Sequence, residues 1–137
     1  MNIQFELLNP VFFLIFWTFI IFLIMAYGRV RFLKNPQDAA HTKNVKTIGP
    51  AWLERVVDNY NHLFEQPVAF YAVTVSIAII NNFDPILIQF AWAFTFTRIL
   101  HSIVQVTFNL VVLRFFLFVV GWLIIAYMTL SQMFIYT

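Results

Sequence analysis

Long apolar stretches without charged residues alternate with short polar segments along this chain. No charged residue occurs from Leu7 to Gly28, from Gln66 to Phe83 or from Phe115 to Thr137, and between Pro85 and Leu113 the only one is Arg98. A helix needs about 20 apolar residues to cross the hydrocarbon core of a bilayer. The pattern therefore predicts an all-α integral membrane protein, a single domain built as a four-transmembrane-helix bundle, with spans over residues 7–27, 60–81, 85–109 and 114–136.

Two of these spans carry polar residues on one helical face. At 100° per residue, one face of the third span gathers Arg98, His101, Ser102, Gln105 and Asn109 within about 100° of one another. At the start of the second span, a similar face gathers Arg55, Asp58, Asn59, His62 and Gln66, with Glu65 at its edge. Both stripes belong to the same half of the membrane, so we expect them to face each other.

Arg98 is the most unusual of these residues. If the third span enters the membrane near Pro85, Arg98 lies roughly 20 Å along a hydrocarbon core of about 30 Å. An arginine at that depth costs about 2.5 to 3.5 kcal/mol on insertion scales unless it reaches the interface or finds a partner. Glu65 and Asp58 are the candidate partners by depth. A packing role and a ligand-binding role for Arg98 both remain open.

Composition and charge support a membrane location. The chain is 62% hydrophobic and only 10% charged, and it contains 18 Phe. Its basic residues are concentrated between the first two spans, in the loop predicted over residues 29–50 and shortly after it, rather than spread as on a nucleic-acid-binding face. The positive-inside rule makes this loop cytoplasmic and places both termini on the opposite side. Nucleic acid is therefore not an expected partner.

The residue types present also limit the chemistry. The chain has no cysteine, which excludes disulfides, thiolate metal ligands and a cysteine nucleophile. His41, His62 and His101 have no i, i+3 or i, i+4 spacing, so no metal site is expected. Pro67 lies inside the second span and is expected to kink it, because proline removes one helical hydrogen bond.

Three blocks of this sequence resemble the family of membrane-associated proteins in eicosanoid and glutathione metabolism (MAPEG). They are GRVRFLKNPQDA (28–39), ERVVDNYNHLFEQPVAFY (54–71) and RILHSIVQVTFNLVVLR (98–114). The second block is most similar to small bacterial members, whose activities are largely unassigned. The resemblance thus implies a location in a bacterial inner membrane.

The resemblance further implies a homotrimer of four-helix subunits. Glutathione would lie between neighbouring subunits near the cytoplasmic face, and a lipophilic small molecule would enter from the membrane lipids. Arg114 matches the arginine that stabilises the glutathione thiolate in catalytic members, and Arg31 matches one that binds a carboxylate. The residues that would line the glutathione site with them are Asn59, His62, Glu65, Arg98, His101 and Gln105.

The second-span motif departs from that of the catalytic members, which show Arg, then Asn four residues later, then Glu three residues after that. Arg55 and Asn59 keep the first spacing, but His62 then takes the position of the glutamate. If Glu65 is aligned with the glutamate instead, Asp58 and His62 stand at the arginine and asparagine positions. Both alignments remain open.

Three functions follow from these patterns. The first is a glutathione-dependent transferase or peroxidase that acts on a lipophilic substrate, with Arg114 as its catalytic residue. The second is a non-catalytic membrane subunit of the same fold that binds a lipid or another protein. A transporter is the weakest of the three, because the sequence shows neither an internal repeat nor a pair of spans interrupted by Gly or Pro.

Overall fold

The structure, a computed structural model, is entirely helical and has four helical segments long and apolar enough to cross a membrane. It describes residues 3–35, 37, 40, 48–81 and 83–134. Within these residues the four-span prediction is confirmed. His41, Lys43 and Lys46 of the predicted loop lie outside the described residues.

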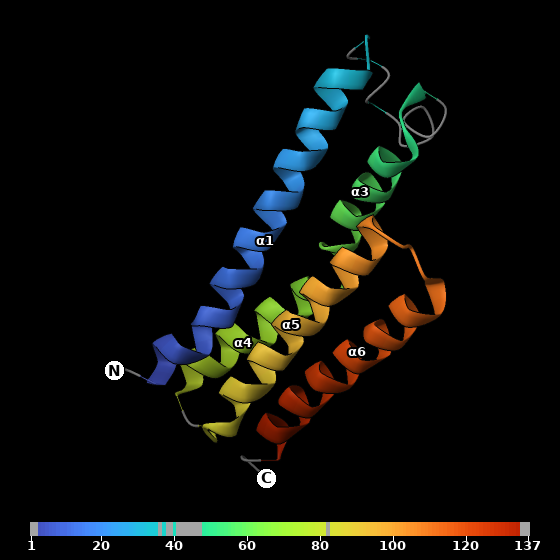
Figure 1. Ribbon diagram of the computed structural model, residues 1–137. Helices are drawn as coiled ribbons and strands as arrows, with labels where there is room; N and C mark the ends of the chain where they lie inside the picture. The colour runs from blue at the N-terminus through green and yellow to red at the C-terminus, as the bar shows by residue number, and fades with distance from the viewer. Residues whose placement is uncertain (1–2, 36, 38–39, 41–47, 82, 135–137) are drawn as a thin grey trace.

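The described residues form five long helices, two of which build the second span (Figure 1). The ends of the predicted and observed segments differ: the second span begins at Ala51 rather than at residue 60, the first helix continues past the predicted loop start at residue 29, and the third span stops at Val106, before Asn109. The helices are α1 (Ile3–Phe32), α3 (Ala51–His62), α4 (Gln66–Ile80), α5 (Ile86–Val106) and α6 (Val111–Met133).

Helix α5 lies in the middle of the bundle. It packs against α1, α3 and α6, while α4 packs against α1 and α6. Helices α1 and α6 therefore take the two outer sides, as Figure 1 shows. The first residues of α1 and the last residues of α6 lie at the same end of the bundle, as expected for an even number of crossings.

Two apolar clusters form the core, one toward each end of the bundle. The first joins α1, α4, α5 and α6 around residues such as Leu14, Phe70 and Phe94, which are fully buried. The second joins α1 to α3 around Met25 and Leu53. Buried polar residues lie between the two clusters: Asn59, Gln66, Arg98, Ser102 and Gln105 are at most 1% exposed. This polar layer contains the candidate functional site.

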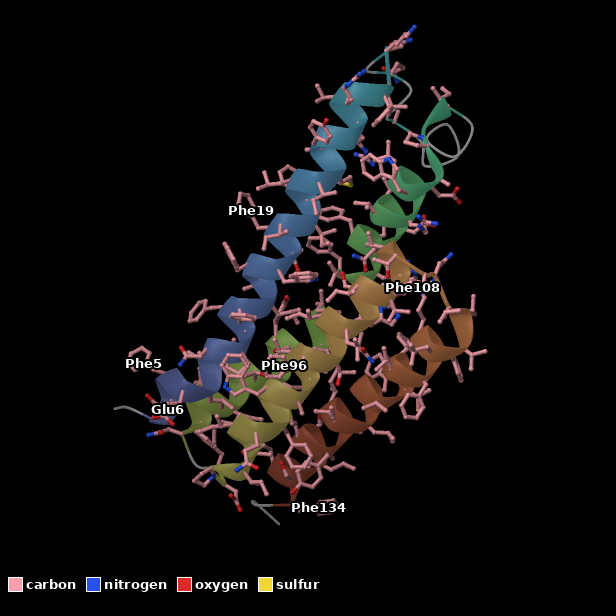
Figure 2. All side chains as sticks on the ribbon, viewed as in Figure 1. Phe5, Glu6, Phe19, Phe96, Phe108 and Phe134 are labelled. Carbon is pink, nitrogen blue, oxygen red and sulfur yellow. The ribbon has the colours of Figure 1, made fainter. Side chains whose placement is uncertain are left out.

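The outer surface is apolar. Many phenylalanines remain exposed, including Phe5 and Phe19, which project away from the bundle in Figure 2. Phe96 and Phe108 are exposed as well, at 59% and 78%. Such a surface is unfavourable in water and favourable against lipid tails, since the bilayer core offers no hydrogen-bonding partners. Membrane lipids are thus the natural environment of these faces.

Candidate functional site

The second span is interrupted in the polar layer. Helix α3 ends at His62, α4 begins at Gln66, and Leu63, Phe64 and Glu65 form turns between them. Pro67 explains the interruption, because a proline ring clashes with the carbonyl four residues earlier, which here belongs to Leu63. Pro67 itself sits in the first turn of α4, where a missing N–H costs little. The kink expected at Pro67 is therefore a complete break just before it.

Arg98, which lies on α5, forms hydrogen bonds with two residues at this break. Its Nη2 atom donates to the carbonyl oxygen of His62 at 2.9 Å, and its Nη1 atom donates to Oε1 of Gln66 at 3.3 Å. The guanidinium thus lies at the C-terminal end of α3, where a positive charge is favourable. The sequence indicates the carboxylates of Glu65 and Asp58 as partners; Glu65 does interact electrostatically with the guanidinium, but the two hydrogen-bond acceptors are neutral oxygens. At the break the His62 carbonyl keeps a long 3.4 Å bond from the Glu65 N–H, and the guanidinium supplies a second, shorter one.

Gln66 extends this connection to α6. Its Nε2 atom donates to the carbonyl oxygen of Phe118 at 3.0 Å. Gly121, one turn along α6, leaves room for the amide, since a Cβ atom there would lie 2.5 Å from Gln66 Oε1. Gln66 had been placed on the polar face of the second span but not among the site residues. Its position on that face was the only sequence signal of this role.

Asn59 belongs to a second buried group of hydrogen bonds. Its Nδ2 atom donates to Oγ of Ser102 at 2.6 Å, and Nε1 of Trp17 donates to the same oxygen at 3.0 Å. One hydroxyl on α5 thereby joins α1 to α3. Asn59 lines neither of the two cavities described below. The amide nitrogen of Asn59 thus joins helices within the subunit, while its buried Oδ1 atom has no hydrogen-bond partner among the described residues.

We expect Ser102→Ala to destabilise the protein by about 2 kcal/mol, because it leaves one buried and one partly buried donor without an acceptor. Thermal unfolding in detergent measures the change. Ser76→Ala is the matched control, since the Ser76 hydroxyl bonds only to the carbonyl of Ala72 in its own helix and is exposed. Equal effects of the two substitutions would contradict the bridging role of Ser102.

A cleft of about 270 Å³ opens where α6 meets the break and α5. Its polar lining consists of predicted site residues from the break, from α5 and from α6, and the rest of its lining consists of apolar side chains of α6. The polar residues are His62, Glu65, Arg98, His101 and Arg114, and the apolar ones are Val111, Phe115 and Phe118. Such a lining can hold charged and lipophilic groups next to one another.

Within the cleft, His62 and Glu65 form a pair. Nδ1 of His62 lies 3.1 Å from Oε2 of Glu65, and the side chains are 38% and 58% exposed. The ring of His101 lies at right angles to that of His62, with 6.4 Å between the centroids. His101 is 5% exposed, and its Nδ1 atom has no hydrogen-bond partner among the described residues. The two histidines therefore differ in their access to a ligand.

Arg114 stands between this cleft and a second cavity of about 210 Å³. Its Nη1 atom donates to Oδ1 of Asn109 at 2.6 Å. Asn109 itself adopts a left-handed backbone conformation (φ 52°) that asparagine tolerates, so it closes the turn between α5 and α6. The second cavity is lined mainly by polar side chains, namely Glu54, Arg55, Asp58, Gln105, Asn109 and Arg114, together with Ala51.

Arg31 is the predicted site residue that lies apart. It sits in the last turn of α1, exposed, with its guanidinium carbon 5.6 Å from the centroid of the Phe32 ring. Neither cavity includes it. A single subunit thus brings together His62, Glu65, Arg98, His101 and Arg114, but not Arg31.

The sequence model of the MAPEG family matches residues 7–134. The chain belongs to the MAPEG family. No curated protein and no solved structure matches it.

Membership of the MAPEG family agrees with the helical fold and confirms the resemblance drawn from the three sequence blocks. The protein is accordingly an integral membrane protein of a family named for eicosanoid and glutathione metabolism. In this MAPEG chain the family match covers every helix that contributes to the cleft.

Proposed function

We propose that this MAPEG protein binds glutathione and uses it on a lipophilic substrate, as a transferase or a peroxidase. The observation that carries the proposal is the position of Arg114, which lines both the polar cavity and the mixed cleft. A charged peptide can occupy the polar cavity while its thiol and an apolar molecule meet in the mixed cleft. Arg114 lies where the two meet.

The side chains fit glutathione, which carries two carboxylates, an ammonium group and a thiol. The polar cavity offers the guanidinium groups of Arg55 and Arg114 to carboxylates, and it also contains the carboxylates of Glu54 and Asp58. Four buried polar atoms around the two spaces have no hydrogen-bond partner among the described residues. They are Nε of Arg98, Nδ1 of His101, Oε1 of Gln105 and Nε of Arg114. Buried polar atoms are normally paired, so these four are candidates to bind a ligand.

Glutathione supplies the nucleophilic sulfur. A free thiol of this type ionises with a pKa of about 8.5, and a neighbouring cation favours the thiolate. The guanidinium group of Arg114 provides this cation. Phe115, Phe118 and Val111 on the same helix exclude water and suit a lipophilic substrate that arrives through the bilayer.

The proposed assembly is a homotrimer with the first loop on the cytoplasmic side of a bacterial inner membrane. The concentration of basic residues in that loop supports this orientation. Arg31 supports the trimer indirectly, because it is exposed and reaches neither cavity of its own subunit. In the trimer it would bind a glutathione carboxylate in the site of a neighbouring subunit.

Glutathione at about five times its Kd should stabilise the purified protein by about 1 kcal/mol, which raises the thermal midpoint by about 3 to 6 °C. Arg114→Ala should remove this shift, together with any thiol-conjugating activity. Lys34→Ala is the control, because Lys34 is exposed and lines neither cavity. An unchanged midpoint of the wild type at millimolar glutathione would refute the proposal.

The second candidate is a non-catalytic subunit that binds a lipid or another membrane protein. It is favoured by the internal hydrogen bonds of Arg98 and Asn59, which use polar groups of both stripes for packing. The same thermal experiment separates the two functions. No glutathione shift, together with a lipid that co-purifies with the protein in stoichiometric amount, would establish the second one.

A further inference from the structure

His62 and Glu65 form a pair because the second span is interrupted between them. His62 is the last residue of α3, and Glu65 is the residue before the first turn of α4. An acidic group is favourable at a helix N-terminus, so Glu65 suits its place at the start of α4. The turn between the two helices brings the side chains within 3.1 Å while both remain partly exposed. The pair opens into the cleft that Arg114 also lines.

The residues of the cleft differ in their ability to accept a proton. Arg98 and Arg114 supply guanidinium groups, which stabilise an anion but do not serve as bases. His101 is only 5% exposed, and its Nδ1 atom is buried. His62 is 38% exposed, and Glu65 holds its Nδ1 atom. Among the described residues no hydrogen bond occupies Nε2 of His62, which leaves this nitrogen available to a ligand.

We propose that His62 is the general base that removes the proton from the thiol, and that Glu65 is the positioning residue that orients its ring. This inference rests on the proposed glutathione-dependent function and adds a catalytic residue to it. A base held by a carboxylate through one ring nitrogen, with the other directed at the nucleophile, is a recurring arrangement for activating thiols and hydroxyls. In this arrangement His62 takes the proton and Arg114 stabilises the negatively charged sulfur.

The proposed reaction is the addition of the thiol to a lipophilic acceptor with a polarised carbon–carbon double bond. The S–H bond breaks, its proton moves to Nε2 of His62, and the electron pair stays on sulfur. Sulfur then bonds to the β carbon, and the electrons of the double bond move toward the carbonyl group of the acceptor. The proton held by His62 finally passes to the α carbon. Because addition returns the proton, neither a further reactant nor a leaving group is required.

The experiment compares His62→Gln and Glu65→Gln with the wild type, using glutathione and a long-chain α,β-unsaturated aldehyde. We expect His62→Gln to lower kcat/KM about 10²- to 10⁴-fold at neutral pH, which is the usual contribution of a general base. The deficit should shrink as the pH rises, since solvent then ionises the thiol. Glu65→Gln keeps the hydrogen bond but removes the charge, so we expect it to move the acid limb of the pH profile and to lower kcat/KM about tenfold.

Several titratable or charged groups face His62 and can also affect the pH profile. These are Glu65 beside it, Arg98 and His101 from α5, and Arg114 from α6, while Asp58 lies one turn earlier on α3. His101→Gln is therefore measured in parallel. An acid limb that disappears in His101→Gln and persists unchanged in His62→Gln would overturn the assignment of the base to His62.

A second readout does not depend on turnover. The ultraviolet absorbance of bound thiolate at neutral pH should fall in His62→Gln, while the thermal shift caused by S-methylglutathione, which has no thiol, should stay as in the wild type. Ser76→Ala, an exposed position on α4 outside both cavities, is the control. If glutathione does not stabilise the wild type, the proposed function fails. If glutathione binds and reacts, but His62→Gln retains the wild-type thiolate signal and pH profile, only the role of His62 fails.

Discussion

Gly121→Val is expected to destabilise the folded protein by about 2 to 5 kcal/mol. A Cβ atom at Gly121 would lie 2.5 Å from Oε1 of Gln66 and 3.0 Å from its Nε2 atom, so the amide must move away from α6. Movement breaks the hydrogen bonds from Arg98 and to the carbonyl of Phe118. Overpacking costs about 1 to 3 kcal/mol, and a buried polar group without a partner costs about the same again. The greater helix propensity of valine offsets only a few tenths of a kcal/mol.

A double-mutant cycle isolates the contact between these two residues. In a Gln66→Ala background the amide is absent, so Gly121→Val should cost at least about 1 kcal/mol less than in the wild type. Thermal or denaturant unfolding in one detergent, with all four proteins, measures the coupling. Equal costs in the two backgrounds would show that Gly121 is needed for a reason other than its contact with Gln66.

The coarse architecture could be predicted because it depends on one-dimensional patterns. Apolar runs long enough to cross the membrane do not depend on their neighbours, so the fold class with four spans and the MAPEG resemblance were available from the sequence and are confirmed. The helical spacing of the two stripes likewise placed His62, Glu65, Arg98 and His101 on faces that meet in one cleft. The functional roles of these residues remain predictions.

The partner of Arg98 could not be predicted in the same way. Depth in the membrane indicated Glu65 or Asp58, since an opposite charge is the obvious partner for a buried cation. Glu65 does interact electrostatically with the guanidinium, but the hydrogen bonds go to neutral oxygens. One of these is the carbonyl of His62, which at the end of α3 keeps a long 3.4 Å bond from the Glu65 N–H. A kink at Pro67 was expected, but its exact form determines which backbone oxygen is released. Side-chain types alone carry no information about such backbone acceptors.

Gln66 and Asn59 illustrate a related difficulty. Both lie on the predicted polar face, yet neither lines the two cavities described, and both form hydrogen bonds between helices. A stripe of polar residues indicates which face is buried, but it does not separate the residues that bind a ligand from those that join helices. Whether a polar side chain binds a ligand or joins helices depends on the room around it. That room is set by neighbours that are distant in the sequence, such as Gly121.

The cost of Arg98→Met should depend strongly on Pro67. In the wild type, methionine leaves the carbonyl oxygen of His62 without its 2.9 Å donor, and hydrogen bonds to charged groups contribute about 1.5 to 3 kcal/mol each. The same substitution also removes a cation whose insertion is unfavourable by about 2.5 to 3.5 kcal/mol, so its net effect alone is a difference of two large terms. The interaction between the two positions is therefore more informative than either substitution.

Pro67→Ala removes the ring that prevents α3 and α4 from joining, so an uninterrupted helix can replace the long 3.4 Å bond from the Glu65 N–H to the His62 carbonyl with a regular bond from the Gln66 N–H. Arg98→Met should consequently be milder in the Pro67→Ala background by about 1 to 3 kcal/mol, and the unfavourable insertion of arginine cancels because it is common to both backgrounds. Unfolding of the four proteins in one detergent gives this coupling, and backbone amide exchange at Gln66 should slow in the double variant. A coupling of zero would mean that the guanidinium does not serve the break, and the role of Arg98 would then have to lie in the cleft itself.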